Sequence, residues 1–266
     1  MSARHEPPLR PAAITLDFGN TLVPVHRDAL RRVVERTATA VVARSGPFSR
    51  DAFLDAWHAE RERQFAEEVP EGREVDVDQR VVRVLARMRG MPPPPPTERW
   101  DDSAAATRSS PEERASAVDA YSAAFVAVIR PPAEVGAILA GLADRFPLAI
   151  LSNWPLAATI DRFVEEAGWG GYFRAIVVSQ RVGAIKPSPV IFAVAEAALG
   201  TPGERILHVG DDWQADVVGA KRAGWLAAYL RDRQGESSLP SSSPDDSVRP
   251  DLVIDDLADL PLALAR

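Results

Sequence analysis

The sequence predicts an α/β fold in which a parallel sheet forms the core and a group of helices follows its first strand. From about residue 133 onward, apolar segments of strand length alternate with segments of helical spacing, which is the pattern of βαβ units. The first strand candidate, 13–17, is separated from the next one by residues 18–147. Helical spacing with charged faces fills this gap, so we expect a helical insert there.

Short apolar runs mark the strands of the predicted sheet. They lie at 13–17, 148–152, 175–179, 205–209, 226–230 and 252–255. The helical segments between the later strands end at Gly168, Gly200 and Gly224, and glycine is a usual helix stop. Strands that alternate with helices pair in parallel, so their carboxyl ends are expected to share one edge of the sheet.

The insert is predicted to contain four helices. Helical spacing covers 26–45, 49–69, 76–90 and 111–129, with start signals at Ser49, Asp51, Ser110 and Pro111. The expected division of the chain is therefore a core domain of 1–24 and 131–266 and a helical domain of 25–130.

Two segments are expected to lack regular structure. Residues 91–97, MPPPPPT, predict an extended connector because successive prolines cannot continue a helix. Residues 235–250 are polar and punctuated by proline, which is typical of a mobile surface loop.

Composition narrows the class of partner. The 266 residues are 46% hydrophobic and carry a formal charge of −7, so a sizeable core is expected, and there is no basic footprint for nucleic acid or an anionic membrane. No cysteine is present, which excludes disulfides, thiol nucleophiles and cysteine-based metal sites. Residues 1–11 lack the apolar segment of a secretory signal, and no apolar run could span a bilayer. We expect a cytoplasmic protein with a small-molecule partner.

Polar side chains follow several of the predicted strands directly. They are Asp17, Ser152, Asn153, Asp211 and Asp212, and Lys186 lies in a loop before a helix that begins with proline. Ligands of parallel sheets bind at the carboxyl ends of the strands. Oxygen ligands suit Mg²⁺, and an ammonium group suits phosphoryl oxygens. These residues therefore predict a site for Mg²⁺ and phosphate.

Four segments in this order, LDFGNTL, LAILSN, GAIKPSPVIF and ILHVGDDWQADVVGAKRAGW, resemble the haloacid dehalogenase superfamily. The resemblance covers nearly the whole α/β part and implies a Rossmann-like parallel sheet core with an inserted α-helical cap. It also implies a Mg²⁺-dependent phosphohydrolase that works through an aspartyl phosphate.

The same resemblance implies a role for each matching position. Asp17 is the expected nucleophile, and Ser152 and Lys186 are expected to hold the phosphoryl oxygens and support catalysis. Substrate-binding positions are Ser152, Asn153, Lys186 and Thr21, and metal-binding positions are Asp17, the backbone carbonyl of Gly19, Asp211, Asp212 and Asp216. Simpler interpretations exist for single residues, since an aspartate or serine after a strand is often only a helix N-cap.

Gly19 departs from the pattern of the phosphatases. Their residue two places after the nucleophile is usually a second aspartate, which protonates the leaving group and activates water. A positioned acid or base contributes about 10²- to 10⁴-fold in rate. His26 is a candidate substitute, although an exposed histidine is the simpler interpretation. Trp154 is expected either to contact substrate or to pack against the insert.

Other chemistries of the superfamily that lack the second aspartate fit less well. Dehalogenases lack an acidic motif like GDDWQAD, and phosphonate-cleaving relatives need a lysine in the cap, where this chain has none before Lys186. Ion-pumping relatives need a membrane domain. The expectation is a phosphohydrolase for a small phosphorylated metabolite, slowed by Gly19; the alternatives are an impaired Mg²⁺ and phosphometabolite-binding protein and, ranked lower, a 2-haloacid dehalogenase.

Overall fold

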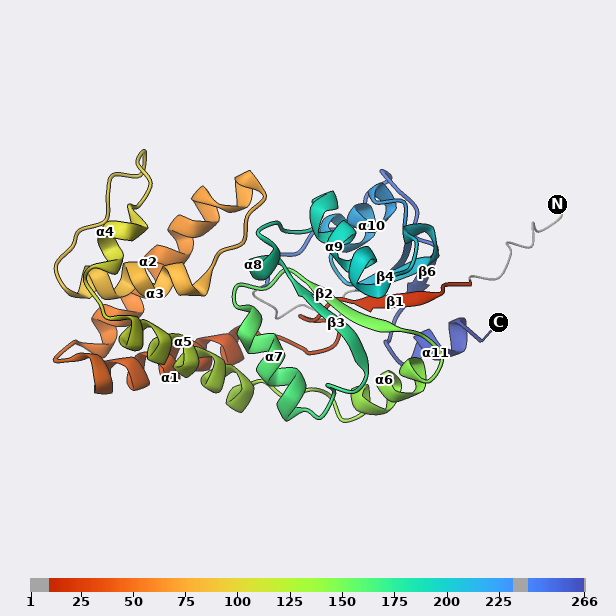
Figure 1. Ribbon diagram of the computed structural model, residues 1–266, viewed down its shortest axis with the longest axis horizontal. Helices are drawn as coiled ribbons and strands as arrows, with labels where there is room; N and C mark the ends of the chain where they lie inside the picture. Colours follow the sequence, from red (N-terminus) through yellow and green to blue (C-terminus); the bar gives the residue numbers. More distant parts are fainter. Residues whose placement is uncertain (1–9, 232–238, 266) are drawn as a thin grey trace.

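The computed structural model describes residues 10–231 and 239–265. Within them, one parallel sheet has the strand order β3-β2-β1-β4-β5-β6 (Figure 1). The strands are β1 (Ala13–Leu16), β2 (Leu148–Ser152), β3 (Phe173–Val178), β4 (Ile206–Gly210), β5 (Leu226–Leu230) and β6 (Leu252–Ile254). The predicted fold class is confirmed, and the predicted strands agree with these bounds to within two residues.

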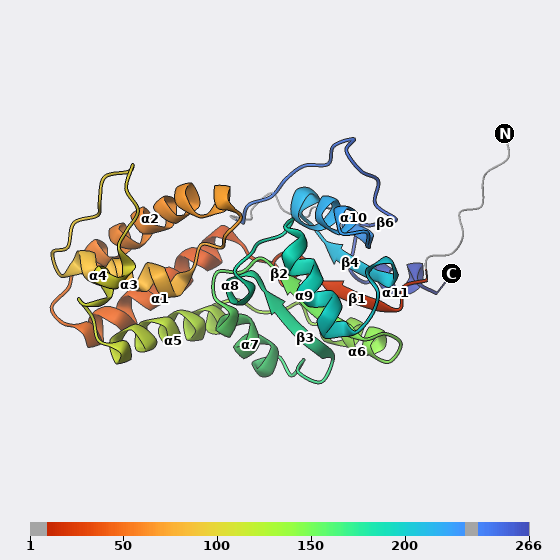
Figure 2. The same cartoon turned by 45° about the horizontal axis from the view of Figure 1, so that its top comes forward.

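Helices cover both faces of the sheet (Figures 1 and 2). One face packs against α6 (Val135–Ala143), α7 (Ala157–Glu166) and α11 (Asp259–Ala263), and the other against α9 (Pro189–Leu199), a π-helix (Trp213–Val218) and α10 (Gly219–Arg222). The central strand β1 serves both layers, because Ile14 and Leu16 belong to one apolar cluster and Ala13 to the other. This alternation follows from the two-residue period of a strand.

The insert between β1 and β2 is helical, as expected. It contains α1 (Arg27–Ser45), α2 (Arg50–Glu67), a 3₁₀ turn (Val69–Glu71), α3 (Val77–Met88), α4 (Asp102–Ala106) and α5 (Pro111–Val128). Ser49 and Ser110 cap α2 and α5 as predicted, with Ser110 in a reciprocal capping box with Glu113. The short helix α4 was not predicted. The boundaries 1–24, 131–266 and 25–130 stay a prediction.

One segment of the insert, residues 72–77, lies against the carboxyl end of the sheet. The amide of Val77 donates to the carbonyl of Pro155 at 2.9 Å, and the amide of Ile185 donates to the carbonyl of Gly72 at 3.0 Å. Ser122 of α5 and Thr159 of α7 add a buried hydroxyl contact of 2.9 Å. The insert therefore reaches the loops that follow β2 and β3.

The two segments expected to be irregular are irregular in the described residues. Residues 92–95 form neither helix nor strand, and Arg63 donates hydrogen bonds to the carbonyls of Pro94 and Pro95. The first residues of the 235–250 segment lie outside the described part of the chain, as do residues 1–9. No helix among the described residues is long and apolar enough to cross a membrane.

Candidate active site

The site is built around a buried ion pair between Asp17 and Lys186. Asp17 directly follows β1 and is held by its amide, which donates to the carbonyl of Val209 in β4 at 2.9 Å. Lys186, 3% exposed, donates to Asp17 Oδ1 at 2.7 Å, to the carbonyl of Leu151 at 2.9 Å and to Asp216 Oδ1 at 2.5 Å. One ammonium group thus joins the ends of β1 and β2 to the π-helix.

Asp216 is hydrogen-bonded through both of its carboxylate oxygens. Besides Lys186, its Oδ1 contacts His208 Nε2 at 2.9 Å, and its Oδ2 accepts from the amide of Asp212 at 2.9 Å. His208 Nδ1 lies 2.8 Å from the hydroxyl of Thr15. Because an ionised carboxylate only accepts, His208 donates from Nε2 and accepts at Nδ1 from Thr15.

Burial and pairing oppose each other in setting the pKa values. Burial raises the pKa of Asp17 to about 6, although Lys186 acts in the opposite direction. Burial alone would raise the pKa of Asp216, but Lys186 and His208 hold it below its usual range. Burial would likewise lower the pKa of Lys186, yet Asp17 and Asp216 hold it above its usual range. The lysine is therefore charged at neutral pH, and burial lowers the pKa of His208, which leaves it neutral.

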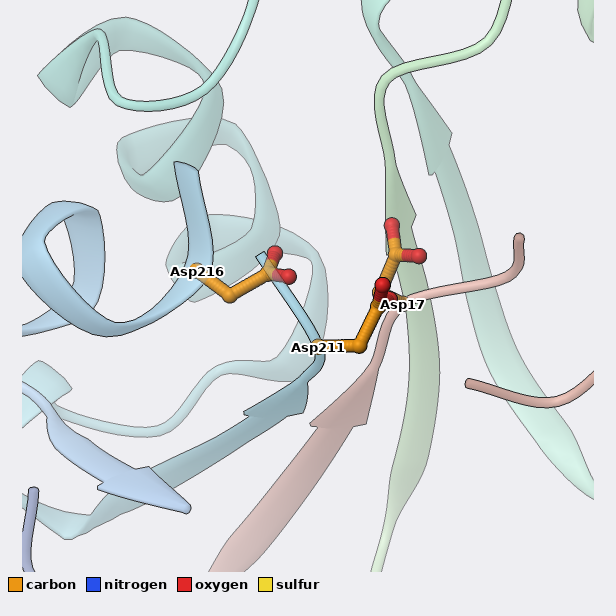
Figure 3. Close-up of side chains that lie close together, drawn as sticks. All are labelled: Asp17, Asp211 and Asp216. Atoms are coloured by element: carbon orange, nitrogen blue, oxygen red, sulfur yellow. The ribbon is translucent and has the colours of Figure 1, made fainter. Parts of the chain in front are cut away.

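Three carboxylates meet where a cation could bind. Asp17, Asp211 and Asp216 each offer an oxygen atom within 4.8 Å of the others, and Figure 3 shows Asp17 and Asp211 side by side with Asp216 directed toward them. The hydroxyl of Thr21 donates to Asp211 Oδ1 at 3.0 Å. Buried carboxylates of this kind need a cation to offset their charge, and hard oxygen ligands fit Mg²⁺. Each of the three carboxylates also accepts a hydrogen bond: Asp17 and Asp216 accept from Lys186, and Asp211 accepts from Thr21.

Asp212 lies outside this cluster. Its Oδ1 accepts from the amide of Ala215 and the hydroxyl of Ser242, both at 2.7 Å, and its Oδ2 accepts from the amide of Ser242 at 2.8 Å. Asp212 is thus the N-cap of the π-helix and a tether for the segment after β5. A direct metal contact, one of the options expected from the sequence, would have to break these bonds.

Ser152 and Asn153 have separate positions at the end of β2. The hydroxyl of Ser152 is buried and makes no hydrogen bond of ordinary geometry among the described residues, and it lies close enough to Asp17 to lower the pKa of that carboxyl. Asn153 instead forms a two-way contact with the backbone of Lys186, accepting at 2.7 Å and donating at 3.0 Å. Asn153 therefore orients the lysine loop, and the substrate-binding role expected from the sequence stays a prediction.

The turn after Asp17 has a special backbone. Asn20 adopts φ of 61°, its amide donates to the carbonyl of Val23, and its side chain accepts from the amide of Val25. This turn carries Gly19 past Asp17 and brings Thr21 to Asp211. The expected metal contact of the Gly19 carbonyl stays a prediction.

His26 is exposed at the start of α1 and its side chain makes no capping bond. The hydrogen bonds described above for Asp17, Asp211, Asp212 and Asp216 do not involve His26. The described contacts therefore do not place this histidine beside Gly19, where the second aspartate would be.

Two contributors to the site were missed from the sequence. His208 interrupts the apolar strand 205–209, and a polar residue in the middle of a buried strand was the available signal. Ser242 lies in a serine-rich segment where no local pattern distinguishes it. Both act through contacts between segments far apart in the chain.

Taken together, the geometry offers a buried carboxylate, a fixed ammonium group, a buried hydroxyl and carboxylate oxygen atoms that could bind a divalent cation. A phosphoryl group is the ligand that uses all of them, since its oxygens accept from the ammonium and hydroxyl groups and bind the cation.

Comparison with known proteins agrees with this description. The family model of the haloacid dehalogenase-like hydrolases matches residues 11–224. Glyceraldehyde 3-phosphate phosphatase of Methanopyrus kandleri is 31% identical over 160 residues, which are 59% of this chain and 67% of that protein.

Dehalogenases also appear among the similar proteins. (S)-2-haloacid dehalogenase 2 of Pseudomonas sp. strain CBS-3 is 33% identical over 136 residues, 50% of this chain and 55% of that protein. The crystal structure of a 2-haloacid dehalogenase from Pseudomonas syringae pv. Tomato DC3000 aligns with a TM-score of 0.65 at 22% identity, covering 96% of this chain and 99% of that one. This structural likeness supports the fold.

Proposed function

The chain belongs to the haloacid dehalogenase-like hydrolases, and from that premise we propose that it is a Mg²⁺-dependent phosphohydrolase for a small phosphorylated metabolite. The observation that carries the proposal is the bridge from Lys186 to Asp17 and Asp216 beside Asp211. It combines a nucleophile, a cation for phosphoryl oxygens and ligands for a divalent metal. The similarity to a phosphatase over 59% of the chain points the same way.

In the proposed reaction, a carboxylate oxygen of Asp17 attacks phosphorus. The bond from phosphorus to the leaving oxygen breaks, and that oxygen takes a proton from water. Water then attacks the phosphorus of the aspartyl phosphate, which releases the Asp17 carboxylate, inorganic phosphate and a proton.

Lys186 and Ser152 donate to the phosphoryl oxygens throughout. Asp17 and Asp211 would hold Mg²⁺, with Asp216 orienting the lysine and the Gly19 carbonyl as a further ligand. The chemistry that Mg²⁺ supplies when bound is neutralisation of negative charge on the phosphoryl group.

In this proposal, Gly19 leaves the departing oxygen of the substrate without a positioned proton donor. Without an acid at this position, the leaving group must depart as an anion or take a proton from solvent. Loss of a positioned acid costs about 10²- to 10⁴-fold, and the penalty is smaller for leaving groups that are weak bases. Aryl and acyl phosphates should therefore be hydrolysed faster than alkyl phosphates.

Turnover of p-nitrophenyl phosphate and a panel of sugar phosphates with Mg²⁺ tests the proposal, with Asp17→Asn as the control. Activity that survives in Asp17→Asn would overturn the nucleophile assignment. For an aryl phosphate, whose leaving group departs readily, hydrolysis of the aspartyl phosphate becomes the slow step because it also lacks a base, so acid quenching followed by intact-protein mass spectrometry should detect one added phosphoryl group. Turnover without that species would point to a substitute base, and His26→Ala would then be assayed.

Two other functions make different predictions. A binding protein that has lost turnover would gain thermal stability from Mg²⁺ and a phosphorylated ligand without releasing product. A dehalogenase would release halide from a 2-haloacid in the presence of a chelator; the carboxylate cluster of Asp17, Asp211 and Asp216 argues against it. The cytoplasmic location stays a prediction.

A further inference from the structure

The space beside Gly19 is filled by two apolar side chains. A Cβ atom placed on Gly19 would lie 2.7 Å from Leu239 Cδ1 and 3.1 Å from Trp154 Cζ3. The first distance is well inside van der Waals contact, so a side chain at this position would have to displace Leu239 and press on the indole. The room that an acid would need is partly taken by Leu239 Cδ1, the end of a side chain that can shift, and by the indole edge, which would have to move by a few tenths of an ångström.

Trp154 is held in this place from both parts of the fold. Its ring makes edge contacts with Phe18 of the core and Phe125 of the inserted helix α5, each with ring centroids 5.3 Å apart. Its amide donates to the hydroxyl of Ser179 at 2.9 Å, and Ser179 donates to Glu74 of the insert at 2.5 Å. Trp154 is 2% exposed, so its position is set by the junction of core and insert.

The indole Nε1 of Trp154 is buried and has no hydrogen-bond partner among the described residues. The ring is therefore fixed by packing alone. A substitution to phenylalanine or leucine removes apolar contact without removing any hydrogen bond to another described side chain, which makes the residue a clean target for mutation.

We infer that Trp154 is a specificity-determining residue, which with Leu239 forms an apolar wall beside Gly19, two residues after Asp17, and selects aryl phosphates. This inference rests on the proposed phosphohydrolase function and refines its substrate class. The wall occupies the position of the proton donor and favours an apolar leaving group.

The chemistry of the leaving group explains why aryl phosphates fit. A phenolic oxygen has a pKa of about 10, as in tyrosine, whereas an alkyl hydroxyl lies near the value of about 16 for water. A phenolate can depart without a proton, and its ring gains from apolar contact with the wall. An alkyl phosphate with a polar leaving group has a more basic leaving oxygen and makes less apolar contact with the wall, so it should be a poorer substrate.

The test compares phenyl phosphate with cyclohexyl phosphate, which match in ring size and differ in leaving-group basicity. Trp154→Leu is expected to raise the KM for phenyl phosphate about tenfold, the cost of losing apolar contact in a pocket, with a smaller change in kcat. Trp154→Phe should keep most of the wild-type KM. Trp100→Leu is the matched control, because Trp100 is also buried with an unpartnered Nε1 and packs in a separate cluster of the insert.

The close contact of Trp154 and Leu239 with Gly19 gives a second test, in which Tm and turnover are measured in combined variants. Gly19→Asp alone should lower the Tm and turnover because of the close contacts. Gly19→Asp combined with Trp154→Leu and Leu239→Ala should recover Tm relative to the single variant and hydrolyse cyclohexyl phosphate about 10²-fold faster than wild type, the usual contribution of a positioned acid.

Two results would overturn the inference: an unchanged KM for phenyl phosphate in a folded Trp154→Leu protein, or Gly19→Asp as stable as wild type. If Trp154→Leu does not fold, the graded change in Trp154→Phe decides the same question. Absence of any wild-type turnover would refute the proposed function instead. Calorimetric binding of phenylphosphonate with Mg²⁺ would then test the wall directly, with weaker binding expected in Trp154→Phe and equal binding contradicting it.

Discussion

The ammonium group of Lys186 lies 2.7 Å from the carboxylate of Asp17, and only 3% of the lysine is exposed. Asp17, the proposed nucleophile, is thus paired with the group that is also proposed to bind the phosphoryl oxygens. Asp216 shares the same ammonium group, so the lysine serves two buried carboxylates. Its removal leaves both without their common counter-charge.

Lys186→Met is therefore expected to lower both turnover and stability. Breaking a buried ion pair costs about 3–5 kcal/mol, which chemical denaturation would measure. The matched control is Lys221→Met, since the chain has only these two lysines and Lys221 pairs with Asp251 near the surface. A change within about 1 kcal/mol is expected there. Equal losses in the two variants would contradict the central role of Lys186.

Substitutions of Asp211 and Asp212 should have different effects on Mg²⁺ affinity. Asp211→Asn removes a charged oxygen from the carboxylate cluster, and we expect Mg²⁺ affinity, measured by calorimetry, to fall by about tenfold or more, as for loss of a favourable charge contact. Asp212→Asn should leave the affinity close to wild type, because its carboxylate bonds Ala215 and Ser242. A comparable loss in Asp212→Asn would restore the metal role that the sequence suggested.

His208 is expected to act as a positioning residue through Asp216. His208→Leu removes the donor to Asp216 Oδ1 and should lower kcat with little change in KM, because the substrate is not its partner. His208→Gln can place an amide donor near the same oxygen and should recover part of kcat. A merely structural role would lower the Tm of both variants without this difference in kcat, and steady-state kinetics with thermal melts separates the two.

Glu74 should make stability depend on pH. Burial raises its pKa above the ordinary 4.5, so the folded state holds the proton more tightly than the unfolded state. The associated stability is present below pH 4.5 and is lost as the pH rises through the folded-state pKa. Glu74→Gln should therefore raise the Tm at pH 8 more than at pH 4, whereas Glu204→Gln, on the surface, should shift both alike. A larger gain at pH 4 would contradict the assignment.

The sequence predicted the sheet and the convergence of the site for local reasons. Apolar runs such as 148–152 identify buried strands, and the carboxyl ends of parallel strands must share an edge, which brings Asp17, Ser152 and Asp211 together. Lys186 was placed by its proline-initiated helix and by the family motif. Each of these features is predicted from one continuous segment, so a single sequence is enough to predict them.

The remaining features depend on packing between distant segments. The position of Trp154 over Gly19 requires Phe125 of the insert, 29 residues away, and Leu239 beyond β5. The bonds of Asp212 with Ser242 span 30 residues. Such contacts leave no periodic pattern in the sequence, so the capping role of Asp212 was not predicted, and its expected part in metal binding stays a prediction.

The bond between Asp212 and Ser242 also changes the freedom of the connection from β5 to β6. A loop fixed at an interior residue behaves as two shorter loops, and each closes at a lower entropic cost than the whole. Length changes between Ser242 and Leu252 would then be absorbed on the far side of the anchor. Leu239, on the near side, would keep its place beside Gly19 while the outer half of the connection varied, so the side chains beside Gly19 and the outline of the surface can evolve independently.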